Sequence, residues 1–155
     1  MASDHVVSNL TVRIIPNDHN NPPGKLADAE LHFGDPMCPI CLGDRDLRVA
    51  DSGPLAGVVG TCATCDGQGV LVGANPLAGL KLIGFGIWER RTGGRNVTFP
   101  ARQYSVNGER RSFALLRPIA DATAQERIRD LILDAYAAYE AETAQADQSA
   151  QAVRS

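Results

Sequence analysis

The sequence CPICLGD at residues 38–44 is matched further along the chain by CATCDGQG at residues 62–69. The two stretches contain all four cysteines of the 155-residue chain, in the spacing C-x2-C-x20-C-x2-C. This spacing lies at the upper edge of the range typical of tetrahedral zinc sites, in which thiolates are favoured ligands. The sequence therefore predicts a structural zinc ion bound by Cys38, Cys41, Cys62 and Cys65, with no ligand position left open for catalysis.

Glycines close behind both cysteine pairs support a metal site. Gly43 follows the first pair and Gly67 the second, and glycine permits the positive φ that turns directing N–H groups at a metal-bound sulfur often need. Two other interpretations stay open: four free thiols that only pack, and redox catalysis by one C-x-x-C pair. The pairs resemble the zinc modules of DnaJ-type chaperones and of small zinc ribbons, which indicates a style of metal binding and not a function.

The composition excludes several classes of protein. With 44% hydrophobic and 21% charged residues, the chain can build a core. No segment is apolar enough to span a membrane, and the N-terminus MASDHVVSNLTVR lacks a secretory signal. We therefore expect a cytoplasmic location, where disulfides are rare. We find no H-E-x-x-H, no phosphate-binding glycine loop and no Ser/His/Asp set, so we do not expect an enzyme.

The charges are unevenly distributed although the net charge is only −3. Residues 1–80 contain four Lys or Arg against nine Asp or Glu, whereas residues 81–129 contain ten against four. Nine of those ten cations are arginine, whose forked guanidinium suits phosphate. The second half of the chain therefore favours a phosphate-binding face, with an ordinary solvated charged face as the alternative.

Hydrophobic patterning predicts several strands and one helix. Alternating or β-branched segments predict strands at residues 10–15, 26–33, 80–90, 96–104 and 110–116. Pro100 indicates an edge or a bulge, and Asn107-Gly108 indicates a tight turn. Apolar residues at helical spacing predict an amphipathic helix from Ala124 to about Glu142.

The expected fold class is α+β: a small antiparallel sheet with a C-terminal helix, plus an inserted zinc-ribbon-like module. Residues 1–33 and 76–142 would form the sheet and helix domain. Residues 34–75, which hold eight glycines and little periodicity, would form the zinc-binding insertion. Residues 143–155, rich in Ala, Gln, Asp and Ser, are expected to form a disordered tail.

Outside the insertion, the sequence is similar to the stage V sporulation protein G (SpoVG) family, small bacterial regulators described as binding DNA and RNA. The similarity rests on an ordered set of segments. They are VRIIP (12–16), GKLADAELHF (24–33), PLAGLKLIGFGIWER (76–90), NVTFPARQYSVNGERR (96–111), LLRPI (115–119) and RIRDLILDAY (127–136). Members of the family lack the insertion at residues 34–75.

This resemblance implies a twisted antiparallel sheet with a C-terminal helix, usually assembled as a homodimer. It attributes nucleic-acid contacts to basic residues near the Pro-x-Arg segment and the start of the helix. Here these correspond to Arg102, Arg110, Arg111, Arg127 and Arg129. The first turn of that helix would also offer N–H groups to a phosphate.

Two functions therefore stand ahead of any enzymatic one. The first is a SpoVG-type regulator that binds DNA or RNA through its arginine-rich face and carries a structural zinc module. The alternative is a zinc-dependent protein-interaction adaptor with no nucleic-acid binding. In that case the zinc module docks a protein partner, and the sheet only supports dimerisation.

Overall fold

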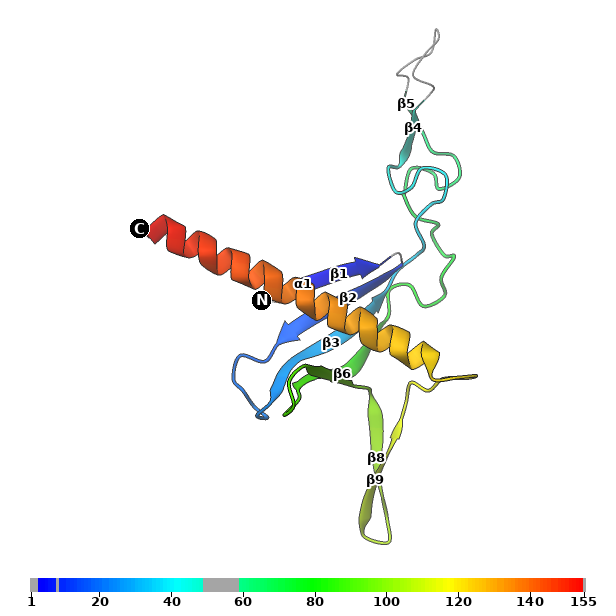
Figure 1. Ribbon diagram of the computed structural model, residues 1–155. Helices are drawn as coiled ribbons and strands as arrows, with labels where there is room; N and C mark the ends of the chain where they lie inside the picture. Colours follow the sequence, from blue (N-terminus) through cyan, green and yellow to red (C-terminus); the bar gives the residue numbers. More distant parts are fainter. Residues whose placement is uncertain (1–2, 8, 49–58, 155) are drawn as a thin grey trace. The chain divides into compact units, whose positions relative to one another are not determined.

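The structure is a computed structural model that describes residues 3–7, 9–48 and 59–154 (Figure 1). Its strands and helix are β1 (Ser3–Val7), β2 (Leu10–Pro16), β3 (Lys25–Phe33), β4 (Asp46–Arg48), β5 (Val59–Thr61), β6 (Lys81–Glu89), β7 (Arg95–Thr98), β8 (Ala101–Val106), β9 (Glu109–Ala114) and α1 (Thr123–Arg154). A five-stranded sheet has the order β1-β2-β3-β6-β7, and β4–β5 and β8–β9 form separate two-stranded sheets. The predicted α+β class, an antiparallel sheet with a long C-terminal helix, is confirmed.

The chain forms two compact units. The sheet unit consists of residues 1–5, 12–31 and 81–155, and the cysteine unit consists of residues 6–11 and 32–80, apart from the residues outside the described ranges. The sheet unit contains α1 and the β8–β9 hairpin, whereas the cysteine unit contains β4, β5 and all four cysteines.

The core of the sheet unit is built by the sheet and α1. Alternate apolar positions of β2 and β3 are buried because successive residues of a strand face opposite sides. Helix α1 adds one apolar stripe. The buried residues are Val12, Ile14, Ala27, Ala29, Leu31, Phe85, Ile87, Val97, Ile132, Ala135 and Tyr136.

A charged contact holds α1 against β7. The Arg95 guanidinium lies 5.0 Å from the centroid of the Tyr136 ring, and its Nη2 donates to Oε2 of Glu140 at 2.8 Å. Burial, followed by the charge of Glu140, raises the pKa of Tyr136, while Arg95 acts in the opposite direction. The side chain of Arg95 therefore bridges the sheet and the helix.

The helix extends further than the sequence pattern predicts. The prediction ends it near Glu142 and makes residues 143–155 disordered, but residues 143–154 continue α1 as an exposed helix. This segment is rich in Ala and Gln, and it has no Gly or Pro to stop the helix. Within the part of the chain that the structure describes, no helix is both long and apolar enough to cross a membrane.

Pro100 divides a segment that the sequence predicts as one strand, residues 96–104. Strand β7 ends at Thr98 and β8 begins at Ala101, because proline has no N–H to continue a ladder. After this break β8 pairs with β9 and with no other strand in the described part of the chain. Asn107 and Gly108 connect them with φ of 51° and 80°, the conformation of a tight type I′ hairpin turn.

Candidate metal centre and candidate nucleic-acid interface

The four cysteines gather in the interior of the cysteine unit, as the spacing predicts. The Sγ atoms of Cys38 and Cys62 are 3.9 Å apart, and those of Cys41 and Cys65 are 3.7 Å apart. All four sulfurs lie within 4.8 Å of one another, and none forms a disulfide. A tetrahedral site with Zn–S bonds of about 2.3 Å places its sulfurs about 3.8 Å apart. The cluster therefore fits a metal ion such as zinc.

The cluster is built from two equivalent halves, 24 residues apart in sequence. Three pairs of equivalent residues share a positive φ: Leu42 and Asp66 (both 52°), Gly43 and Gly67 (88° and 72°), and Arg45 and Gly69 (70° and 80°). In both halves the fourth position after the second cysteine is thus left-handed, although only one half has a glycine there. The arginine at residue 45 hides this repeat in the sequence.

Main-chain hydrogen bonds join the two halves reciprocally. The Cys38 N–H donates to the Gly69 carbonyl at 3.0 Å, and the Cys62 N–H donates to the Arg45 carbonyl at 2.9 Å. The short strands continue the relationship: Asp46 pairs with Thr61 in one half, and Met37 pairs with Val70 in the other. Each half therefore fixes the first cysteine of the other half, and the approximate twofold relation brings the four sulfurs together.

Backbone N–H groups are directed at the sulfurs. The N–H of Gly69 donates to Sγ of Cys65 at 3.3 Å. Burial opposes ionisation of Cys65, but this N–H and the neighbouring thiols lower its pKa to about 7. Burial raises the pKa of Cys41 to about 11, against hydrogen bonds from the backbone of Arg45 and Gly43. Metal binding requires thiolates, which such N–H groups stabilise.

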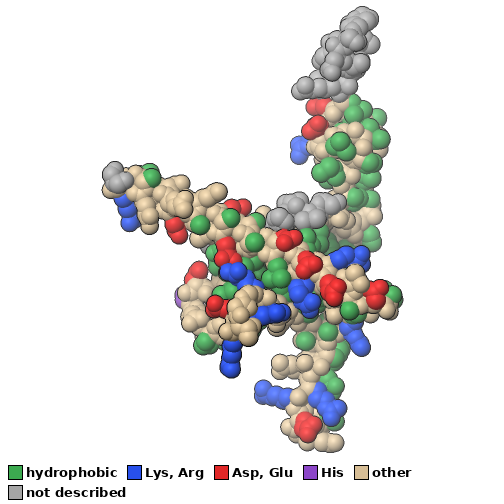
Figure 2. Space-filling model, in the orientation of Figure 1, with side chains coloured by type: hydrophobic (Ala, Val, Ile, Leu, Met, Phe, Trp, Pro, Cys, Tyr) green, Lys and Arg blue, Asp and Glu red, His purple; other side chains and the backbone are tan. Residues whose placement is uncertain are grey.

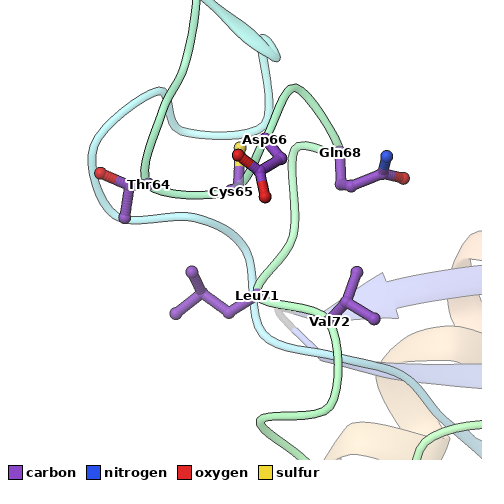
Figure 3. Close-up of a pocket in the computed structure, with 6 residues that line it drawn as sticks. All are labelled: Thr64, Cys65, Asp66, Gln68, Leu71 and Val72. Carbon is purple, nitrogen blue, oxygen red and sulfur yellow. The ribbon is translucent and has the colours of Figure 1, made fainter.

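A hollow of about 470 Å³ lies beside the cluster (Figure 3). It is lined by Thr64, Cys65, Asp66, Gln68, Leu71 and Val72. Cys65 is the most exposed of the four cysteines at 7%, whereas Cys38 and Cys62 are at 0%. The hollow therefore lies against Cys65, the cysteine of the cluster that keeps the largest exposed fraction.

The arginines predicted to bind nucleic acid lie on two elements, the β8–β9 hairpin and α1, and on different faces of the hairpin. Register in the β8–β9 hairpin pairs Arg102 with Phe113, Tyr104 with Arg111 and Ser105 with Arg110. Directly paired residues share a face, and neighbours along a strand alternate. Arg102 and Arg111 therefore lie on one face of the hairpin, and Arg110 lies on the other. Spacing along the sequence places Arg110 and Arg111 together, but the pleat separates their side chains.

Arg127 and Arg129 lie on α1, in different environments. Arg127 is exposed. Arg129 is half-buried, with its guanidinium 5.8 Å from the centroid of the Phe99 ring. Its Nε is buried and has no hydrogen-bond partner among the described residues. The structure thus makes Arg129 in part a packing residue.

The start of α1 is already occupied by protein groups. The Thr123 N–H donates to Oδ1 of Asp121 at 2.9 Å, and the N–H groups of Gln125 and Glu126 donate to the Ala122 carbonyl. Hydrogen bonds from the side chain and the backbone of Thr123 lower the pKa of Asp121, against burial. Glu126 also lies in the first turn, so a phosphate bound at this end of the helix would lie near two carboxylates.

No protein-family model, no curated protein and no solved structure matches this chain.

Proposed function

We propose that this chain is a non-enzymatic, cytoplasmic regulator of the SpoVG type that binds DNA or RNA through the arginines of its β8–β9 hairpin. The observation that carries the proposal is that this hairpin is exposed to solvent and has a net positive charge. Every residue of β8 and all but the last of β9 are exposed. Residues 101–117 contain four arginines and one glutamate, a net charge of +3. Figure 2 shows Lys and Arg side chains on this part of the surface.

These cations have few partners of their own. Arg111 lies 3.5 Å from the carboxylate of Glu109, with both side chains largely exposed. Such a pair contributes little to stability. Across residues 3–7, 9–48 and 59–154, no carboxylate forms an ion pair with Arg102 or Arg110. The hairpin arginines are thus available to an anionic polymer.

The order of elements supports the SpoVG resemblance. Strands β2, β3 and β6, a strand ending near Pro100, a hairpin with an Asn-Gly turn and a terminal helix follow one another as the resemblance implies. The four cysteines and the strands β4 and β5 lie between β3 and β6 along the chain, where the sequence predicts an insertion.

We further propose that the metal is zinc and that its role is structural. Four sulfur donors at tetrahedral spacing favour zinc and leave no ligand position for a substrate. Cys38, Cys41, Cys62 and Cys65 would each supply one thiolate. The bound ion would hold together a unit whose described residues include few other buried side chains.

Homodimerisation belongs to the same proposal. The sheet face opposite Val12 and Ile14 carries Ile15, which is 37% exposed, and the half-buried Trp88. A second copy of the chain would cover this face. Sedimentation at micromolar concentration should show a dimer, and a purely monomeric protein would contradict this part of the proposal.

The test of nucleic-acid binding is fluorescence anisotropy with labelled DNA and RNA of mixed sequence over a series of salt concentrations. We expect affinity to fall steeply as salt rises, because phosphate contacts release counterions. Replacing Arg102 and Arg111, which share one face of the hairpin, together with alanine should flatten the slope for duplex DNA by about two units. The matched control is Arg91→Ala with Arg154→Ala, which removes two exposed arginines outside the hairpin.

Two results would count against this function. If the double hairpin variant, confirmed to be folded, binds like the parent at every salt concentration, these arginines do not form the interface. If the parent binds neither polymer at low salt, the adaptor becomes the better proposal. The adaptor is favoured by exposed apolar side chains of the cysteine unit, namely Met37 (49%), Ile40 (55%), Leu42 (68%) and Val72 (71%).

A further inference from the structure

One face of the β8–β9 hairpin combines aromatic and basic side chains. The register places Arg102, Tyr104, Val106, Glu109, Arg111 and Phe113 together on this side, here called the aromatic face. The opposite side carries Ala101, Gln103, Ser105, Arg110, Ser112 and Ala114. The two sides therefore differ in chemistry, although both belong to a basic hairpin.

Tyr104 and Phe113 are more exposed than an aromatic residue of the core. They are 41% and 42% exposed, whereas Phe85 in the core of the same unit is 0% exposed. Their ring centroids are 5.8 Å apart with an interplanar angle of 61°, an edge-to-face contact that leaves ring surface uncovered. Two aromatic side chains thus remain at the surface of a hairpin that pairs with no other strand among the described residues.

Each ring has an arginine directly across the hairpin. Arg102 is paired with Phe113, and Arg111 is paired with Tyr104. A flat apolar surface beside a cation matches a ligand that offers a flat base and a phosphate within one repeating unit. In a duplex the bases are stacked on one another, so only their edges are accessible. A single strand can turn its bases onto the rings.

We propose that the aromatic face binds single-stranded nucleic acid, with bases stacking on Tyr104 and Phe113 and phosphates held by Arg102 and Arg111. This inference rests on the proposed nucleic-acid-binding function and narrows its ligand. Arg110, on the opposite face, adds only to the general positive charge.

Charge argues against a second copy of the chain on the same face. A symmetric interface places the same patch on both subunits. Two arginines and one glutamate of each chain would then meet the identical set, which brings net positive charge against net positive charge. This positive charge attracts a polyanion, whereas it repels a second copy of the same face.

The experiment compares anisotropy of labelled single-stranded DNA and RNA, each about 12 nucleotides long, with that of the DNA duplex of the same sequence. The principal variant is Tyr104→Ala with Phe113→Ala. Its matched control is Gln103→Ala with Ser112→Ala, a directly paired couple on the opposite face. All four positions are exposed, so circular dichroism and metal content should stay at the parent values.

We expect the aromatic variant to bind single strands at least about 30-fold more weakly, because each lost stack contributes independently of sequence. Its salt slope should equal that of the parent, since no phosphate contact is removed. Tyr104→Phe should keep the parent affinity because the ring is retained. Arg102→Ala should flatten the single-strand slope by about 0.7, and Arg110→Ala should change it less.

The outcomes separate this inference from the function on which it rests. If the aromatic variant binds the duplex and the single strand with equally reduced affinity, or binds both as tightly as the parent, stacking is refuted while nucleic-acid binding stands. If the variant changes only the sedimentation coefficient, a second copy covers the face and the inference is wrong. If the parent binds no nucleic acid at low salt, the proposed function itself has failed.

Discussion

The equivalence of Gly69 and Arg45 leads to a prediction with opposite signs at two matching positions. Both residues follow the second cysteine of their pair by four positions, and both have positive φ. Gly69→Ala should weaken zinc binding, because it adds a side chain where the backbone is left-handed. Arg45→Gly should strengthen it, because it removes a side chain from the same conformation.

The magnitudes follow from the local geometry. A left-handed φ costs an ordinary residue about 1–2 kcal/mol. When alanine replaces glycine, about 0.4–1 kcal/mol of this cost is offset because the unfolded chain has less conformational entropy to lose on folding. The Cβ added at Gly69 would lie 2.9 Å from the carbonyl oxygen of Gly43, and such crowding adds about 1–3 kcal/mol. We expect Gly69→Ala to lower zinc affinity about 30- to 150-fold, and Arg45→Gly to raise it about 2- to 5-fold.

The assay is competition for zinc with a chromophoric chelator, because folding of the cysteine unit and metal binding are coupled. Gly60→Ala is the matched control, because its added Cβ would meet no described atom within 4 Å and its φ is not positive. If Gly69→Ala binds zinc as tightly as Gly60→Ala, backbone geometry does not position the sulfurs. The same conclusion would follow if Arg45→Gly weakened zinc binding as much as Gly69→Ala.

Three further outcomes are expected. Metal analysis should give close to one zinc per chain, and Cys62→Ser should loosen the cysteine unit while leaving the circular dichroism of the sheet unit intact; substoichiometric zinc after expression with ample zinc would contradict this. Arg95→Ala should destabilise the sheet unit by about 1 kcal/mol in denaturant unfolding, against little change for the exposed Arg91→Ala. The pKa of Asp121 is lowered in the folded protein. Its carboxylate therefore stabilises the folded protein fully when the pH is above the ordinary pKa of aspartate, and this stabilisation is lost as the pH falls through the lowered pKa. The difference in melting temperature between the parent and Asp121→Ala should therefore shrink on acidification, and a constant difference would refute this role.

Much of the fold follows from local pattern. The strands near residues 10–15, 26–33 and 80–90 are within one or two residues of β2, β3 and β6, because alternation reports directly which side of a strand is buried. Asn107-Gly108 forms the expected turn because few other residue pairs tolerate two positive φ values. The sequence pattern does not predict the end of α1 correctly, because the polar composition of residues 143–154 is typical of disorder although Ala and Gln also favour helix.

The sequence by itself determined the ligand set of the candidate metal centre. Two short C-x-x-C motifs identify Cys38, Cys41, Cys62 and Cys65 without knowledge of the fold, because ligand type and spacing are local properties. Only the tertiary structure decided that each half forms hydrogen bonds to the first cysteine of the other. The sequence does not show this repeat, because Arg45 stands at the position where the second half has Gly69. The tertiary structure also separated Arg110 from Arg102 and Arg111 and joined Tyr104 to Phe113. Strand register made these choices: a shift of one residue moves a side chain to the other face, and the pairing that fixes it connects positions that are not neighbours in the sequence.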